Sequence, residues 1–110
     1  MQKRCAVRKI KRLPVTFINN SLEQNGFSSD ISFNGIFIRT RRALNPGNAL
    51  RIIVELDCGS RVQMSGVVCR SIRTGTMDIK NGMGVRLTEI HPEYTMFVSR
   101  LLHERHPAAA

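Results

Sequence analysis

Alternation of apolar and polar side chains recurs along most of this chain and constrains its fold more than any other feature. Successive side chains of a β-strand point to opposite faces, so alternation indicates a strand with one buried face. The clearest case is the run of residues 50–56, whose inward side chains would be Leu50, Ile52, Val54 and Leu56. Residues 20–26 are polar and predict a loop. We predict six strands, over residues 15–19, 27–33, 35–40, 50–56, 61–73 and 83–87.

The pattern changes period near the end of the chain. Apolar residues there recur at the spacing of one helix face, in the order Tyr94, Phe97, Val98, Leu101 and Leu102. Pro92 lies near the predicted helix start, where its missing N–H costs nothing. Gly66 interrupts the longest strand and predicts a bend or bulge of the kind that small barrels need. We therefore predict a mainly β fold, a six-stranded antiparallel β-barrel with a C-terminal α-helix.

The chain carries a formal net charge of +9, and the basic residues are unevenly distributed. Residues 1–12 hold six of the 17 Lys and Arg residues and none of the eight acids, which leaves a net charge of only +3 for the remainder. A block of this kind favours a flexible arm that attracts anions. We predict a basic arm over residues 1–12, one domain over 13–104 and a frayed tail over 105–110.

Several classes of protein and site are disfavoured. Cys5, Cys58 and Cys69 form no Cys-x-x-Cys pair, so we expect reduced thiols and no metal site. No apolar run approaches the roughly 20 residues of a membrane-spanning helix, and no signal-peptide core follows the basic N-terminus. We therefore expect a cytoplasmic protein without a membrane span. No nucleophile with a partner base and no carboxylate pair stands out, so we expect no enzyme and no cofactor.

Residues 30–35 combine an acid, a hydroxyl and a glycine within an apolar alternation. If this segment is a strand, Asp30 and Ser32 face outward together, while Ile31 and Phe33 lie in the core. Gly35 follows at a point where the backbone can change direction or be approached closely by a ligand.

The basic arm contains arginines at a spacing of four residues. Two such pairs are present, Arg4 with Arg8 and Arg8 with Arg12, and the sequence pattern alone does not show which pair belongs to a site. A guanidinium group binds phosphate or the O6 and N7 edge of guanine bidentately. A carboxylate such as that of Asp30 accepts hydrogen bonds from the N–H groups of guanine, and a hydroxyl such as that of Ser32 donates to phosphate. Together these groups match a ligand that contains both guanine and phosphate.

The order of these motifs resembles the PilZ domain family, bacterial receptors for the second messenger cyclic di-GMP. Arg4 and Arg8 resemble the family's Arg-x-x-x-Arg, and Asp30, Ser32 and Gly35 resemble its Asp/Asn-x-Ser-x-x-Gly. The resemblance covers nearly the whole chain. It implies a six-stranded barrel with a C-terminal helix, and cyclic di-GMP bound by these five residues between the barrel and the arm.

Two further residues are secondary candidates for the same site. The family position before the first arginine is implicated in the choice between one nucleotide and a stacked pair, and in this chain that position is Lys3. Lys3 would support the extra phosphates of a pair, or it is equally a solvated lysine with no role in binding. Arg70 would reach the ligand from the long strand, or it is an exposed strand charge. We expect the arm to fold over the bound dinucleotide and to signal to a protein partner that the sequence does not identify.

Two other functions stay open. One is an adaptor that binds protein without any nucleotide. The other is a nucleic-acid-binding barrel, which would carry basic residues and exposed aromatic rings across its strands. Here the basic excess lies in the arm and most aromatic residues occupy core positions, so the pattern disfavours a nucleic-acid partner.

Overall fold

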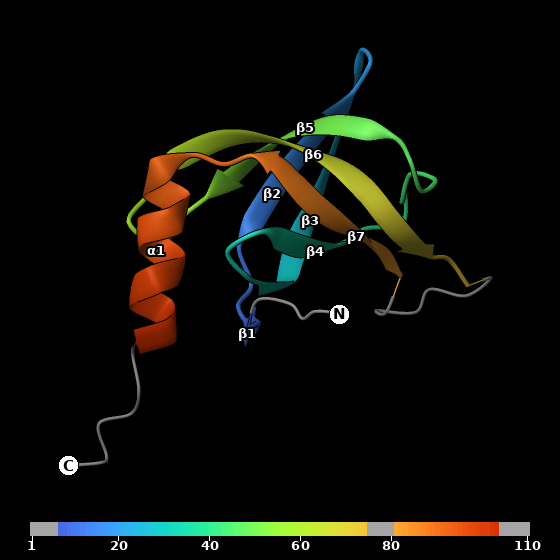
Figure 1. The fold of residues 1–110 in the computed structure, drawn as a ribbon. Helices are drawn as coiled ribbons and strands as arrows, with labels where there is room; N and C mark the ends of the chain where they lie inside the picture. The colour runs from blue at the N-terminus through green and yellow to red at the C-terminus, as the bar shows by residue number, and fades with distance from the viewer. Residues whose placement is uncertain (1–6, 75–80, 104–110) are drawn as a thin grey trace.

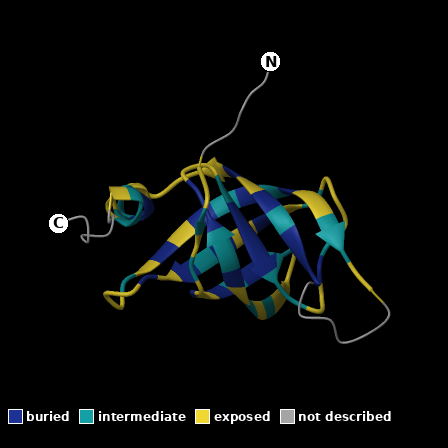
Figure 2. Ribbon diagram, turned by 90° about the horizontal axis from the view of Figure 1, so that it is seen from below, coloured by how far each residue is buried: buried dark blue, intermediate teal, exposed yellow. Residues whose placement is uncertain are grey.

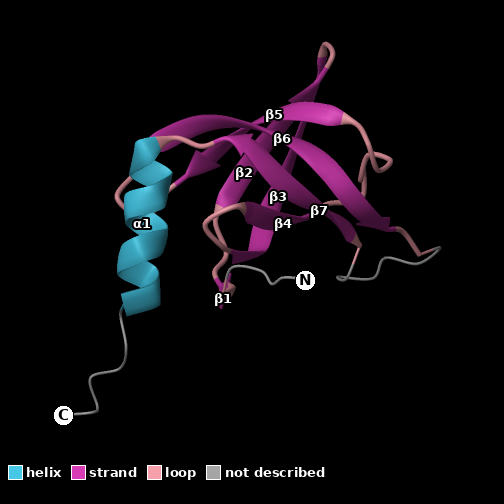
Figure 3. Ribbon diagram, in the orientation of Figure 1, coloured by secondary structure: helices cyan, strands magenta, loops and turns pink. Residues whose placement is uncertain are grey.

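A computed structural model describes residues 7–74 and 81–103 of the 110-residue chain (Figure 1). Its elements, in chain order, are β1 (Lys9–Ile10), β2 (Pro14–Asn19), β3 (Leu22–Ile31), β4 (Gly35–Arg39), β5 (Ala49–Glu55), β6 (Arg61–Ile72), β7 (Gly82–Glu89) and α1 (Pro92–His103). Figure 3 shows strands throughout, with the helix as the last element. The predicted mainly β fold with one C-terminal helix is confirmed.

Six of the strands form a closed antiparallel barrel. Hydrogen bonding runs in the order β3-β2-β5-β6-β7-β4, and β4 then pairs with β3 to close the barrel. Ile31 pairs with both Lys9 of β1 and Ile36 of β4, so β1 and β4 lie on opposite edges of β3. The short β1 therefore continues the edge of β3 that β2 occupies. The predicted six-stranded barrel is confirmed, and β1 is an addition to it.

The strand β1 belongs to the segment that we predicted as a flexible arm, of which residues 7–12 are described. The buried Ser28 holds this segment, because its hydroxyl donates to the carbonyl of Lys11 (2.6 Å) and accepts from the N–H of Leu13 (2.9 Å). The guanidinium of Arg12 lies 4.0 Å from the ring centroid of Phe27. The second half of the arm thus lies along β3, and the flexibility of the whole arm stays a prediction.

Alternate side chains of the strands fill the barrel, and Figure 2 shows buried and exposed residues alternating along the ribbon. The inward residues predicted for 50–56 are all buried. The helix α1 packs its predicted apolar stripe on this core, with Tyr94 and Val98 fully buried. No helix in the described part of the chain has the length and apolar character needed to span a membrane.

The predicted loop at residues 20–26 is wrong, because these residues form the apex and first half of the β2–β3 hairpin. Asn19 pairs with Leu22, and Asn20 turns the chain with φ of 58°, a left-handed conformation that Asn tolerates better than most residues. This part of the hairpin is largely exposed. Its strand therefore carries polar residues, which in the sequence look like a loop.

The predicted irregularity at Gly66 is confirmed. The register between β6 and β7 shifts between Ser65 and Gly66. A Cβ atom on Gly66 would lie 2.5 Å from Cγ1 of Val85, closer than any side chain allows. Glycine is therefore required here for close packing of the two strands.

Replacing Gly82 with alanine should destabilise the barrel. Its Cβ would meet the carbonyl oxygen of Ile38 and would lie 2.6 Å from Cε1 of Phe37. We expect Gly82→Ala to lower the free energy of unfolding by about 1–3 kcal/mol in urea denaturation. Gly84→Ala is the matched control on the same strand, since its nearest neighbour would be Cγ of Arg70 at 3.5 Å. Equal losses in the two variants would contradict this steric explanation.

Candidate functional site

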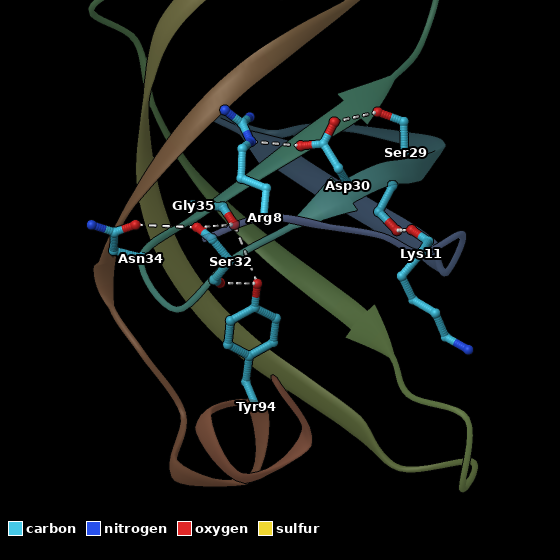
Figure 4. A network of polar contacts seen from close by, with 9 residues as sticks. Arg8, Lys11, Ser29, Asp30, Ser32, Asn34, Gly35 and Tyr94 are labelled. Carbon is cyan, nitrogen blue, oxygen red and sulfur yellow. Dashed lines mark hydrogen bonds and ion pairs between the residues drawn. The ribbon is translucent and has the colours of Figure 1, made fainter. Parts of the chain in front are cut away.

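The turn between β3 and β4 is the centre of the candidate site (Figure 4). The N–H of Ser32 donates to the carbonyl of Gly35 (2.9 Å), which closes the turn. The N–H of Leu87 donates to the carbonyl of Asn34 (2.9 Å), which ties the turn to β7. The hydroxyl of Ser32 is within hydrogen-bond distance of Oδ1 of Asn34 (3.1 Å) and of the Gly35 carbonyl (3.4 Å). The backbone of this turn is therefore fixed from several directions.

The helix α1 supports the same turn through Tyr94. The Tyr94 hydroxyl donates to the carbonyl of Ser32 (2.8 Å) and lies 3.3 Å from that of Gly35, as Figure 4 shows. Burial raises the pKa of the Tyr94 hydroxyl well above its usual range, because the phenolate would lose its hydration. Tyr94 thus stays protonated and acts as a donor that joins α1 to the turn.

The prediction that Asp30 and Ser32 face outward together is wrong for Ser32. The strand β3 ends at Ile31, so the alternation stops before Ser32, whose exposed fraction is 6%. Phe33, predicted in the core, is 36% exposed because it lies in the turn. Ile31 is fully buried, as predicted.

Asp30 faces outward because it alternates with the buried Ile31 at the end of β3. A β-bulge lies just before it, since the register with β4 shifts between Ser28 and Asp30, and Ser28 and Ile31 are both buried although they are three residues apart. The side chain of Asp30 consequently lies on the outer face and is 30% exposed. Its carboxylate accepts from Nε of Arg8 (3.0 Å) and from the hydroxyl of Ser29 (3.4 Å).

Beside the turn lies a cavity of about 310 Å³. Three arginines from separate parts of the chain contribute to its lining, namely Arg8 before β1, Arg70 on β6 and Arg86 on β7. Ser32 and Gly35 also line it, and no acidic residue within 7–74 and 81–103 does. The cavity is therefore suited to an anionic ligand.

The outer face next to this cavity is formed by one row of residues across four strands. Asp30 pairs with Phe37, Phe37 with Gly84, and Gly84 with Arg70. The guanidinium of Arg70 lies over the Phe37 ring, 5.9 Å from its centroid. A Cβ on Gly84 would lie 3.5 Å from Cγ and 3.6 Å from Nε of Arg70, so the absence of a side chain at Gly84 lets Arg70 cross the row to the Phe37 ring.

The structure brings together most of the residues predicted for the site. Arg8, Ser32, Gly35 and the secondary candidate Arg70 line the cavity, and Asp30 adjoins it through its ion pair with Arg8. Arg4 and Lys3 lie outside the described residues. The two possible arginine pairs share Arg8. Arg12, which belongs only to the second pair, stacks on Phe27 and does not line the cavity.

Sequence reasoning did not assign Arg86, Gly84, Asn34 or Tyr94 to the site. Arg86 lies opposite Gly35 in the sheet, and Gly84 lies opposite Phe37. The alternation of 83–87 does predict an outward Arg86, but it does not show which strand lies next to it. Asn34 and Tyr94 carried no signal of their own, because Asn is common in turns and Tyr94 fits a core stripe.

Comparisons with known proteins identify a family. The family model described as PilZ domain matches residues 2–103. No curated protein matches the chain.

Solved structures include close matches to the fold. Bacillus subtilis inhibitor of motility, MotI/DgrA, has a TM-score of 0.74 and 23% identity; the match covers 96% of this chain and 54% of MotI/DgrA, so the present chain spans about half of that protein. The PilZ domain of CeSA from a cellulose-synthesizing bacterium has a TM-score of 0.61 and 20% identity, covering 89% of this chain and 96% of that domain. At these identities the likeness concerns the fold.

The raised pKa of Tyr94 predicts a loss of stability at high pH. Its contribution is complete below the ordinary tyrosine pKa of 10.0 and is lost as pH rises above that value, since only the unfolded chain then ionises. The free energy of unfolding should fall by about 1 kcal/mol between pH 10 and pH 11 through this one group. Tyr94→Phe should lack this component in urea denaturation.

Tyr94 is the only tyrosine of the chain, so the ultraviolet absorbance of phenolate reports its ionisation directly. In the folded protein, titration near the ordinary tyrosine pKa would contradict the burial argument.

Proposed function

Because the chain belongs to the PilZ domain family, whose members are generally cyclic di-GMP receptors, we propose that it binds cyclic di-GMP at the cavity beside the β3–β4 turn. One observation carries the proposal. Arg8, Arg70 and Arg86 converge on a cavity that is lined by no acidic residue of the part of the chain that the structure describes. Cyclic di-GMP brings two phosphates and two guanines, so it presents the groups that guanidinium side chains bind best.

Arg8 and Asp30 have complementary roles in this proposal. Their ion pair lies at the surface, with side chains 52% and 30% exposed, and such pairs contribute about 0–1 kcal/mol. A doubly charged ligand can therefore replace it at little cost. Arg8, together with Arg4, would then bind phosphate or the guanine O6 and N7 edge, and the released Asp30 carboxylate would accept from the guanine N–H groups.

The turn residues supply shape and short polar contacts. A Cβ on Gly35 would lie 3.2 Å from the Val85 carbonyl oxygen, so this position has little room for a side chain. Ser32 already has its hydroxyl at the cavity lining, where it can donate to a phosphate oxygen in place of Asn34. Hydrogen bonds from Tyr94 keep the turn in this geometry.

The output would be carried by the arm. In our proposal, the part of the arm that precedes β1 closes over the bound dinucleotide, and the arm then forms a surface that a partner protein recognises. The like charges of the arm oppose its compaction, and the two phosphates of the ligand neutralise part of that charge.

Arg8→Ala should weaken cyclic di-GMP binding by roughly one to two decades, since a charged hydrogen bond contributes about 1.5–3 kcal/mol. Isothermal titration calorimetry measures this directly. Arg12→Ala is the matched control, because Arg12 has the same charge in the same segment but stacks on Phe27 away from the cavity. If both variants lose affinity equally, the arm acts through net charge and the site assignment fails.

Asp30→Ala should reduce the preference for guanine over adenine. The carboxylate accepts from N–H groups that adenine does not present in the same arrangement, so its removal should affect cyclic di-GMP more than cyclic di-AMP. Competition binding with both dinucleotides and with GMP gives the ratio of affinities. An unchanged ratio of the two affinities would show that Asp30 does not recognise guanine.

A further inference from the structure

The β2–β3 hairpin has a free backbone edge. Residues Leu22–Gly26 of β3 pair with β2, whereas β4 pairs with β3 only from Phe27 onward. In Figure 1 this hairpin extends beyond the neighbouring strands. Among the described residues, none pairs with the other edge of Leu22–Gly26 in the sheet. A free edge presents N–H and C=O groups to which a further strand can add.

A second cavity, of about 340 Å³, is lined in part by residues of this edge. The hairpin contributes Phe17, Leu22 and Gln24, and the connection after β4 contributes residues 41–44. Phe17 is 1% exposed and belongs to the core, so the floor of the cavity is apolar. Leu22, by contrast, is 60% exposed. An apolar side chain from a partner would find a matching surface here.

The rim of this cavity is cationic. Arg41, Arg42 and Arg73 line it, and no acidic residue of the described chain does. Arg73 is held by neutral acceptors, since it donates to the carbonyl of Ala43 (3.3 Å) and to Oδ1 of Asn45. The ion pairs found within residues 7–74 and 81–103 involve neither Arg41 nor Arg42. Three positive charges therefore meet without a compensating carboxylate.

We propose that this surface binds an extended acidic segment of a partner protein. The segment adds as a strand to the free edge of Leu22–Gly26, places carboxylates on Arg41 and Arg42, and packs an apolar side chain against Leu22 over Phe17. Backbone pairing at an edge is a property of a polypeptide, which favours protein over lipid or nucleic acid. The two cavities share no lining residue, so the peptide and the nucleotide do not compete for the same side chains.

A fluorescein-labelled peptide with the central sequence Glu-Thr-Leu-Thr-Glu is the direct probe. In a strand its first, third and fifth side chains share one face, so both carboxylates and the leucine reach the cavity together. We expect saturable binding to the full chain by fluorescence anisotropy, and none for the same peptide with Lys in place of Glu. Two further peptides, N-methylated at alternate residues in the two possible registers, test strand addition. Only one register blocks the paired edge, so one of them should lose binding.

Protein variants test whether peptide binding depends on the arginines of this cavity or only on the net positive charge of the protein. Arg41→Glu with Arg42→Glu should weaken peptide binding by more than tenfold, because both carboxylate contacts turn into repulsion. Arg100→Glu is the control, since Arg100 is an exposed arginine of α1 that lines neither cavity. The unchanged protein, the double variant and Arg100→Glu should bind cyclic di-GMP alike if both proposals hold.

Three outcomes would overturn this inference. They are equal binding of the Glu and Lys peptides, retention of binding by both N-methylated peptides, and binding to phosphatidylglycerol vesicles with no binding of the acidic peptide. None of them bears on the nucleotide site, and a loss of cyclic di-GMP binding in Arg8→Ala does not bear on this surface.

Discussion

Closure of the barrel through β3 is the constraint on which the rest of the structure depends. This strand pairs with β1 and β2 along one edge and with β4 along the other. The register between β3 and β4 shifts at a bulge between Ser28 and Asp30. The two residues that flank this bulge both bind the segment before β2, because the buried Ser28 fixes residues 11–13 and Asp30 pairs with Arg8. The strand that closes the barrel therefore also carries part of the candidate site.

The positions of the charged residues in this protein matter more than its net charge. Outside the arm the net charge is small, yet arginines gather at two cavities on separate parts of the barrel. At the first cavity the ion pair of Arg8 with Asp30 provides a carboxylate nearby, while at the second Arg73 donates to neutral acceptors on Ala43 and Asn45. A surface ion pair is easily exchanged, whereas uncompensated charge raises the local anion concentration. The two cavities thus differ in whether a carboxylate lies beside their arginines.

The sequence predicted the parts of the fold in which each strand is paired on both sides and covers the core. Residues 50–56 alternate with one exception, the apolar Ile53 on the outer face, and β5 lies between β2 and β6 with its inner face on the core. The hairpin residues 20–26 were misread because an exposed hairpin carries no apolar face. The end of β3 was misread because the turn at Ser32 is fixed by Tyr94, far away in the chain. Arg8, Asp30, Ser32 and Gly35 were identified as motif residues, whereas Arg86 required knowledge of its cross-strand neighbour Gly35.

The order of the strands along the chain has a consequence for synthesis on the ribosome. β4 is the neighbour of β7 in the closed barrel, yet some 40 residues separate them in sequence. While β7 is still within the ribosome exit tunnel, the nascent chain exposes unpaired edges on β4 and β6 together with much of its apolar interior. Tyr94 and Val98, which complete the core, emerge later still. A truncation before β7 therefore leaves a sheet that cannot close.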